Sequence, residues 1–165
     1  MARHIPMEVR LTRRPVDRTH PGRSVRETDR QDLAILLYAA YRGTIDDEGE
    51  TFADALAEID KLFAGGYGEF LPDCSFVIEQ GEFLASASLV TWWDPHDAPL
   101  VAFTMTRPEA RGRGMARTLL GESMNVLLQR GYERLTLIVT DGNAPAQRLY
   151  RSLGFQKITD VLTQR

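Results

Sequence analysis

The sequence predicts an α/β (α+β) domain in which a mixed sheet carries helices on its faces. Its 165 residues are 43% hydrophobic and 26% charged, which is typical of one globular domain large enough to bury a core. Apolar residues recur with a helical period before residue 65 and with the period of strands from residue 75 onward. The expected order of elements is β, α, α, β, β, β, α, β, α, β.

Residues 1–24 form a basic segment that is expected to contribute a first strand at 5–14. Residues 1–30 contain eight arginines against four acidic residues, whereas residues 43–73 contain nine acidic residues against one lysine. A basic arm can bind nucleic acid, but this one is interrupted by prolines and has no interleaved aromatic residues. We therefore favour a solvated or partner-contacting segment and do not expect nucleic acid as a partner.

Two helices are expected between this segment and residue 65. Thr28 begins a capping box with Gln31, and Gly43 ends the first helix. The acidic loop TIDDEGE, residues 44–50, leads to Thr51, which caps the second helix. The apolar stripes are Leu33, Leu36, Leu37, Ala40 and Tyr41 in the first helix and Leu56, Ile59, Leu62 and Phe63 in the second.

Strands are expected from residue 75. Residues 75–79 and 82–90 predict a hairpin around a Gln-Gly turn. Residues 91–97, TWWDPHD, predict a further turn, and 98–106 predict another strand. Pro108 follows that strand and cannot donate a hydrogen bond to a sheet.

The remaining chain alternates helix and strand. An apolar stripe predicts a helix that ends near Gly131, and RLTLIVT at 134–140 is typical of a strand covered on both faces. A short helix at 144–153 and a last strand near 155–163 complete the sheet. The stripe of the longer helix is Ala116, Leu119, Leu120, Ser123 and Leu127.

The stretch TRPEARGRGMARTLL, residues 106–120, places glycines and arginines where a strand gives way to a helix. Glycine lets a ligand approach the backbone, and the first N–H groups of a helix have no internal partners. Such a turn attracts anions. It is not a Walker loop, which needs Gly-Lys, and Arg117 stands where a dinucleotide fingerprint needs its third glycine.

The turn resembles a known motif. Arg111-x-x-Gly114-x-Ala116 matches [QR]-x-x-G-x-[GA] of the GNAT superfamily of acyl-CoA N-acyltransferases. The second half of that pattern follows at the usual separation, as an apolar strand, then Asn143-x-x-Ala146-x-x-Leu149-Tyr150, then Gly154-Phe155. The resemblance spans roughly residues 25–163, and its specific motifs lie within 99–155.

The resemblance implies an N-acetyltransferase domain at residues 25–165. Its sheet would be mostly antiparallel, with six to seven strands splayed at the cofactor site and about four flanking helices. Acetyl-CoA (coenzyme A) would be the cosubstrate, with its pyrophosphate on the turn 111–116 and its pantetheine arm along the preceding strand. No metal is implied. The implied cofactor-binding residues are Thr104, Met105, Thr106, Arg111, Gly112, Arg113, Gly114, Met115, Ala116 and Asn143.

Tyr150 is the implied catalytic residue. It shares a helix face with Ala146, Leu149 and Leu153, so a core aromatic is the alternative interpretation. In the family a tyrosine at this place points toward the thioester sulfur. A phenol, with a pKa of about 10, is a weaker acid than a thiol of about 8.5. A hydrogen bond to the leaving thiolate therefore fits better than complete proton transfer.

The general base is left open. Some family members carry a glutamate on the splayed strand, but APLVAFTMT at 98–106 contains no acidic residue. Asp94 and His96 in the turn 91–97 are candidates, with a solvated turn as the alternative. Glu109 is expected at the surface.

The acidic loop has two interpretations, because in the family the first two helices wall the acceptor site. Its carboxylates would recruit a cationic amine, or they form a solvated run of charge. Trp92 and Trp93 would line the acceptor channel or cover the sheet. The single cysteine, Cys74, lacks a neighbouring base and fits a reducing compartment. The loop acids are Asp46, Asp47, Glu48 and Glu50.

We therefore expect a cytoplasmic acetyltransferase that moves an acetyl group from acetyl-CoA to a primary amine of a small molecule or peptide. The amine would attack the thioester directly in a ternary complex. A non-catalytic acyl-CoA-binding or regulatory module is the alternative, and a homodimer is compatible with both. No apolar stretch approaches the roughly 18 residues of a membrane span, so no membrane partner is expected.

Overall fold

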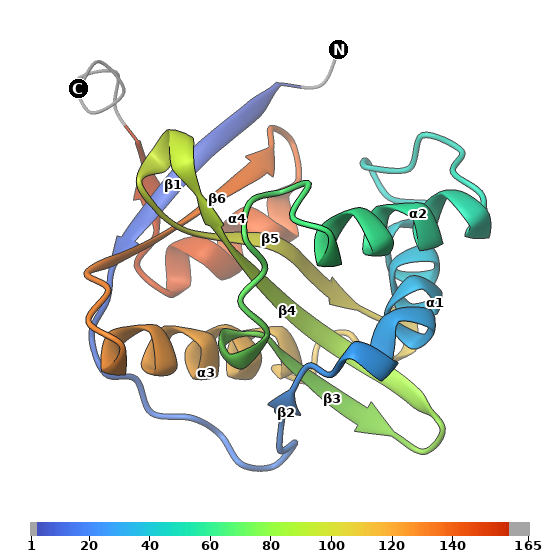
Figure 1. The fold of residues 1–165 in the computed structure, drawn as a ribbon, viewed down its shortest axis with the longest axis horizontal. Helices are drawn as coiled ribbons and strands as arrows, with labels where there is room; N and C mark the ends of the chain where they lie inside the picture. Colours follow the sequence, from blue (N-terminus) through green and yellow to red (C-terminus); the bar gives the residue numbers. More distant parts are fainter. Residues whose placement is uncertain (1–2, 159–165) are drawn as a thin grey trace.

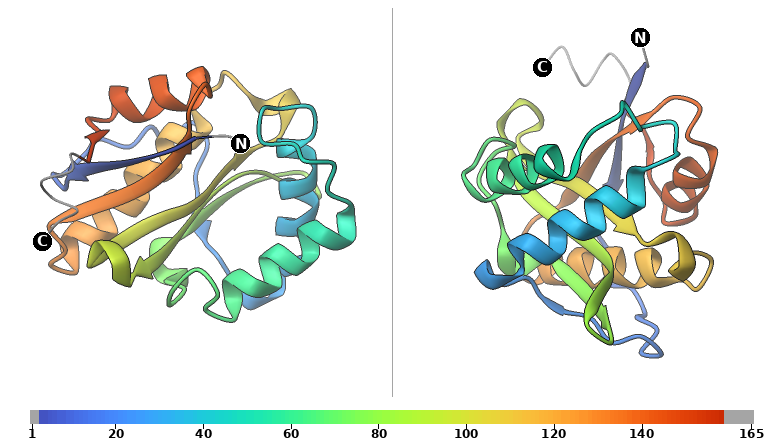
Figure 2. Two further views of the ribbon diagram at one scale, coloured as in Figure 1. Left: turned by 90° about the horizontal axis from the view of Figure 1, so that it is seen from above. Right: turned by 90° about the vertical axis from the view of Figure 1, so that its right-hand side faces the viewer.

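The computed structural model describes residues 3–158, which form a seven-stranded sheet with two helices on each face (Figure 1 and Figure 2). The strand order is β2-β3-β4-β5-β6-β1-β7, and only β5 and β6 are parallel neighbours among these strands. The predicted mixed, mostly antiparallel sheet with four α-helices is confirmed. The strands are β1 (His4–Arg10), β2 (Arg23–Ser24), β3 (Phe76–Gln80), β4 (Phe83–Trp93), β5 (Ala98–Thr106), β6 (Arg134–Thr140) and β7 (Gln156–Lys157). The α-helices are α1 (Arg30–Tyr41), α2 (Phe52–Phe63), α3 (Met115–Gln129) and α4 (Ala144–Ser152).

β5 and β6 diverge along the second half of β5 (Figure 1). Their parallel pairing is limited to Leu100 opposite Thr136 and Val101 opposite Leu137. On its other edge β5 stays paired with β4 as far as Thr106. The last residues of β5 therefore have a sheet partner on one edge and an open edge toward β6, as the resemblance implies.

The two faces of the sheet carry separate hydrophobic cores. α1 and α2 lie side by side on one face, where Leu33 and Ile59 are fully buried in the same cluster as Leu89 of β4. α3 and α4 cover the other face, where Leu120 and Leu153 pack in a cluster with residues of β1 and β6. Within residues 3–158, no helix is both long and apolar enough to cross a membrane.

Local capping explains how two of these helices begin. The Thr51 hydroxyl accepts a hydrogen bond from the Asp54 N–H, and the Asp54 carboxylate accepts one from the Thr51 N–H, so the predicted cap of α2 is confirmed. The Asn143 side chain accepts from the Ala146 N–H at 3.3 Å and caps α4. The predicted capping box at Thr28 is wrong, because a 3-10 turn at Glu27–Asp29 precedes α1.

The predicted turn at 91–97 is also wrong over its first three residues. β4 continues to Trp93 and pairs there with Ala98, so the turn occupies only the residues between these two strands. The β-branched and aromatic residues TWW favour a strand, and their pairing with the start of β5 outweighs the nearby turn residues.

The ends of the sheet differ from the prediction as well. β1 ends at Arg10 rather than residue 14, because its partner β6 begins opposite it at Arg134. The two-residue strand β2 has no sequence pattern of its own and was missed. β7 is described at Gln156–Lys157, and residues 159–163 of the predicted last strand lie outside the described residues. Ile138 of β6 is 45% exposed, so this strand is not covered along its whole length.

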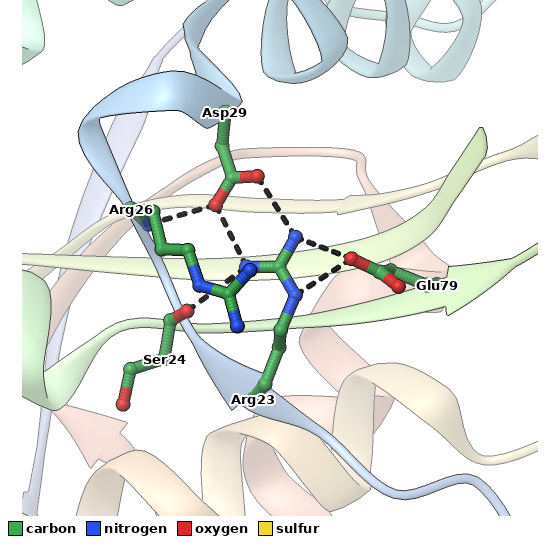
Figure 3. Close-up of polar contacts among 5 residues, drawn as sticks. All are labelled: Arg23, Ser24, Arg26, Asp29 and Glu79. Carbon is green, nitrogen blue, oxygen red and sulfur yellow. Dashed lines mark hydrogen bonds and ion pairs between the residues drawn. The ribbon is translucent and has the colours of Figure 1, made fainter. Parts of the chain in front are cut away.

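An ionic cluster around the buried Asp29 joins the basic N-terminal segment to the rest of the sheet (Figure 3). The Arg23 guanidinium donates to both carboxylate oxygens of Asp29, at 2.8 and 2.9 Å, and to Glu79 of β3 at 2.7 Å. The Arg26 N–H donates to the same Asp29 carboxylate at 2.7 Å. Burial opposes the charge of Asp29, but these hydrogen bonds and the two arginine charges hold its pKa below the ordinary value.

Candidate active site

Two cavities meet at the diverging half of β5, where Thr104 lines both. One, of about 690 Å³, is lined by the turn 110–117, the end of β5 and the start of α4, and we call it the glycine-turn cavity. The other, of about 520 Å³, is lined by α1, α2, the loop between them and β6, and we call it the acidic cavity. The residues that line both cavities form what we call the junction: Tyr41, Asp46, Thr104, Asn143, Ala146 and Tyr150.

The glycine turn is shaped for close approach to the backbone. Gly112 and Gly114 have φ angles of 78° and 79°, and a Cβ atom at either position would meet nothing within 4 Å. α3 begins directly afterwards with Met115, which is 1% exposed and anchors the turn in the core. The unpaired N–H groups of this first helical turn therefore border an open cavity, which favours an anionic ligand.

The arginines of this turn have different surroundings. The Arg111 guanidinium donates to the main-chain oxygen of Ala40 in α1 at 2.6 Å, which ties the turn to the last residues of that helix. Arg117, which the motif does not include, also lines the cavity, and its guanidinium donates to the Ser152 hydroxyl. Arg113 lines neither cavity. The structure thus brings the predicted cofactor-binding residues around one cavity, with Arg113 as the exception.

The end of β5 contributes a polar wall. Ser86 of β4 donates to the main-chain oxygen of Met105 and lies 2.9 Å from the Thr106 hydroxyl. Thr104 belongs to the junction, where its hydroxyl is close enough to lower the pKa of Tyr150 but makes no hydrogen bond of good geometry among the described residues. Three other buried side-chain atoms of the described residues also have no hydrogen-bond partner but line neither cavity, whereas the Thr104 hydroxyl borders both and is available to a ligand there.

Tyr150 lies at the same place, on α4. Its side chain is 9% exposed, and its ring packs edge-on against Phe155, with 5.8 Å between ring centroids. Burial raises the pKa of Tyr150; the Thr104 hydroxyl lowers it and the Asp46 charge raises it further, with a net increase. The phenol therefore keeps its proton at neutral pH and is a hydrogen-bond donor to a group in the junction.

Asp46 ties the loop after α1 to the far side of the open sheet. One of its carboxylate oxygens accepts from the Thr140 hydroxyl at 2.7 Å, and the other faces the Asn143 amide nitrogen at 3.4 Å. Its neighbour Ile45 lies beside Gly142, where an added Cβ atom would come within 3.2 Å of it. The loop is therefore held against the turn between β6 and α4.

The acidic cavity concentrates negative charge and aromatic rings. All four acids of the predicted loop line it, together with two from α2. Among residues 3–158, Arg42 is the only basic side chain of the lysine or arginine type in its lining. Tyr67 donates to Glu58, and burial, followed by the Glu58 interaction, raises the pKa of this phenol. The acidic residues are Asp46, Asp47, Glu48, Glu50, Asp54 and Glu58, and the aromatic ones are Tyr38, Tyr41, Tyr67 and Phe103.

The base candidates from the turn after β4 lie elsewhere. Asp94 and His96 line neither cavity. Asp94 accepts from the Trp92 indole, and His96 lies 2.9 Å from the Thr136 hydroxyl. Burial, followed by the Arg134 charge, lowers the pKa of His96. These residues have structural partners at the opposite end of β5 from the junction.

Three further candidates are also outside both cavities. Glu109 pairs with Arg107 at 3.1 Å. Trp92 packs against Tyr132, with 6.0 Å between ring centroids, and so covers the sheet. Cys74 is fully buried, and burial raises the pKa of its thiol, which disfavours the reactive thiolate. In the part of the chain that the structure describes, no group of three or more His, Cys, Asp or Glu could hold a metal ion.

Comparison with known proteins gives a consistent result. The Acetyltransferase (GNAT) family model matches residues 31–155. A mycothiol acetyltransferase of Saccharomonospora viridis is 44% identical over 33% of this chain and 18% of its own length. The chain spans less than two fifths of the length of the curated relatives it matches.

Solved structures share the fold. A GCN5-related N-acetyltransferase from Sphaerobacter thermophilus superposes with a TM-score of 0.70 at 18% identity, over 95% of this chain and 50% of that one. AAC(6')-Iy in complex with the bisubstrate analog CoA-S-monomethyl-acetylneamine superposes with a TM-score of 0.61 at 16% identity, over 82% of this chain and 90% of that one.

Proposed function

The chain belongs to the acetyltransferase (GNAT) family, and from this we propose that it transfers an acetyl group from acetyl-CoA to a primary amine. The observation that carries the proposal is the meeting of two cavities of opposite chemistry at Tyr150 and Thr104. One cavity offers helix N–H groups and arginines to a phosphorylated ligand, and the other offers carboxylates to an amine. A thioester and an amine that occupied both would meet at the junction.

In this arrangement the pyrophosphate of coenzyme A binds at Gly112 and Gly114, and the pantetheine arm bonds to the open edge of β5. The amine attacks the thioester directly in a ternary complex, and a main-chain N–H near Met105 or Thr106 stabilises the oxyanion. The thiolate leaves beside the Tyr150 hydroxyl. Because this phenol keeps its proton, it stabilises the thiolate by a hydrogen bond.

The charge of the acidic cavity supports a cationic acceptor. Carboxylates that line one cavity raise the local concentration of an amine cation. The neighbour AAC(6')-Iy was solved with a single ligand that joins coenzyme A to an acetylneamine, which supports adjacent cofactor and acceptor sites in this fold. A small-molecule or peptide amine in a cytoplasmic setting remains part of this proposal.

A non-catalytic acyl-CoA-binding module is the second candidate, because β5 carries no acidic residue. Release of thiol from acetyl-CoA, followed against a panel of mono- and diamines, separates the two. The enzyme releases thiol in proportion to acetylated amine, whereas the module binds acetyl-CoA and releases none.

Cofactor binding at the glycine turn is tested with Gly114→Val. A side chain at Gly114 meets no neighbouring atom, but the φ of 79° strains it, so we expect some loss of stability while the valine occupies the approach of the pyrophosphate. Gly81→Val is the matched control, because Gly81 also has a positive φ and open space but lies in the turn between β3 and β4. Calorimetry should show acetyl-CoA binding lost only in Gly114→Val. Unchanged affinity in a folded Gly114→Val protein contradicts the assigned site.

A further inference from the structure

On the basis of the proposed function, we propose that Asp46 is the catalytic group that takes a proton from the attacking amine. Asp46 is the one carboxylate among the described residues that line both cavities. The other acids of its loop line the acidic cavity alone. Its position therefore satisfies the first requirement for a general base, which is reach to the atom that loses the proton.

The Asp46 carboxylate is fixed from outside its own loop. The Thr140 hydroxyl at the end of β6 donates to one oxygen at 2.7 Å, and the Asn143 amide lies 3.4 Å from the other. Asn143 is itself held as the cap of α4. A carboxylate has about four lone-pair sites, so these contacts leave capacity for an N–H group of a bound amine.

The groups around Asp46 match this role. Burial, with a smaller contribution from the Asp46 charge, raises the pKa values of Tyr41, on α1, and Tyr150, on α4, so both hydroxyls stay protonated beside it. His4 of β1 and the other acids of the loop and of α2 line the acidic cavity as well. The nine-tenths buried Tyr150 and the unpartnered hydroxyl of Thr104 mark the thioester position across the junction.

The proposed step balances. A cationic acceptor first loses one ammonium proton to water through the acidic cavity. The neutral amine then attacks the thioester carbon through its lone pair, so the C–N bond forms and the nitrogen becomes positively charged. One N–H proton then passes to the Asp46 carboxylate. Collapse of the tetrahedral intermediate breaks the C–S bond, and the electron pair leaves on sulfur beside Tyr150. The thiolate takes a proton from water, and Asp46 returns one to water through the acidic cavity.

The test separates proton transfer from attraction of a cation. Asp46→Asn keeps the size of the side chain and an oxygen that can accept from Thr140, but it removes the base. The variant is assayed with acetyl-CoA and two amines: 1,4-diaminobutane, which is cationic, and hydroxylamine, which is uncharged at neutral pH. We expect kcat/KM to fall by about 10²-fold or more with both amines, while acetyl-CoA affinity is kept. A loss confined to the diamine overturns the proposal, because it assigns Asp46 to charge attraction alone.

Two further variants address structural explanations. Thr140→Val removes the hydroxyl that holds Asp46 but leaves the carboxylate. Its loss of kcat/KM should therefore be at least tenfold smaller than that of Asp46→Asn. A loss of kcat/KM as large as that of Asp46→Asn overturns the proposal, because Asp46 would then act only by holding its loop against Thr140. Asp94→Asn, outside both cavities, is the control for loss of one acid. Wild-type protein that releases no thiol with any amine of the panel contradicts the proposed function, whereas an active wild type with an equally active Asp46→Asn contradicts the Asp46 inference alone.

Discussion

Two polar clusters of this molecule join chain segments that are far apart in sequence, but they differ in how fully their atoms are paired. In the Arg23 cluster (Arg23, Arg26, Asp29 and Glu79; Figure 3), both oxygens of the buried Asp29 accept hydrogen bonds from within the protein. In the junction, Thr104 has a buried hydroxyl oxygen with no partner among the described residues.

We infer from this difference that the Arg23 cluster contributes to stability and the junction to the reaction. A buried polar atom without a partner costs about 1–3 kcal/mol, so a fold tolerates one most readily where a ligand pairs with it. In the Arg23 cluster, both oxygens of the buried Asp29 carboxylate are already paired within the protein. Changes in the Arg23 cluster should therefore alter the free energy of unfolding, and changes in the junction should alter turnover.

The largest expected effect is on turnover in Tyr150→Phe. The substitution keeps the ring and its contact with Phe155 and removes only the hydroxyl. We expect kcat to fall by about ten- to a thousandfold, while acetyl-CoA binding and the melting temperature stay unchanged. Steady-state kinetics measures kcat, and calorimetry measures acetyl-CoA binding and the melting temperature. Tyr132→Phe, outside both cavities, is the matched control.

The same variant has a second readout. The loss in Tyr150→Phe should shrink with a thioester whose thiol has a lower pKa, because that thiolate needs less stabilisation. A loss that does not depend on the leaving thiol would limit Tyr150 to positioning. Full activity in the folded variant would exclude Tyr150 from the mechanism. It would also contradict the expectation that changes in the junction alter turnover.

The next effect is on stability, in Asp29→Asn. Asp29 is 5% exposed, whereas its partner Arg23 is about a quarter exposed and keeps Glu79, so we expect the substitution to cost about 1–3 kcal/mol. Urea unfolding should show this loss, with activity per folded molecule unchanged. Asp60→Asn is the control, because its pair with Arg30 is largely exposed, and such pairs contribute about 0–1 kcal/mol. Equal losses of unfolding free energy in the two variants would show that the Arg23 cluster contributes no more than an exposed ion pair.

Acid unfolding tests the same cluster through the pH dependence of the melting temperature rather than through the free energy of unfolding at one pH. The pKa of Asp29 is lower in the folded protein than its ordinary value of 3.8. Its contribution to stability is therefore complete above pH 3.8 and is lost as the pH falls through the folded-state pKa. Below that range the melting temperatures of wild type and Asp29→Asn should converge. A constant difference down to the lowest pH would contradict the assigned ionisation.

Sequence reasoning succeeded where the signal is local. The motif at Arg111, the cap at Thr51 and the cap at Asn143 each depend on residues a few positions apart, and the glycine turn was placed correctly. It failed where contacts are distant. Asp46 meets Thr140 across 94 positions, and no local pattern indicates that pairing.

The misplaced base candidates have the same cause. Asp94 and His96 follow two tryptophans that continue β4, so they lie beyond the end of a longer strand than the sequence predicts. His96 also contacts Thr136, which is 40 positions away. The helix start at Thr28 was missed because Asp29 is committed to Arg23 and Arg26, which lie before the helix rather than in it.

The smallest expected effect tests whether the charge beside the junction acts at a distance. Glu48→Gln combined with Glu50→Gln removes two charges from the acidic cavity and leaves Asp46 in place. In bulk water a unit charge about 8 Å from a cation contributes about 0.5 kcal/mol, which is about twofold for each charge. We therefore expect the KM of a cationic amine to rise about fourfold at low salt, with acetyl-CoA affinity unchanged. In 1 M salt the screening length falls to about 3 Å, so the difference should nearly vanish.

Glu82→Gln in the turn between β3 and β4 is the control for loss of charge elsewhere. An unchanged KM at low salt would make the loop a solvated run of charge, and an increase that persists in 1 M salt would mean that these residues contact the acceptor directly.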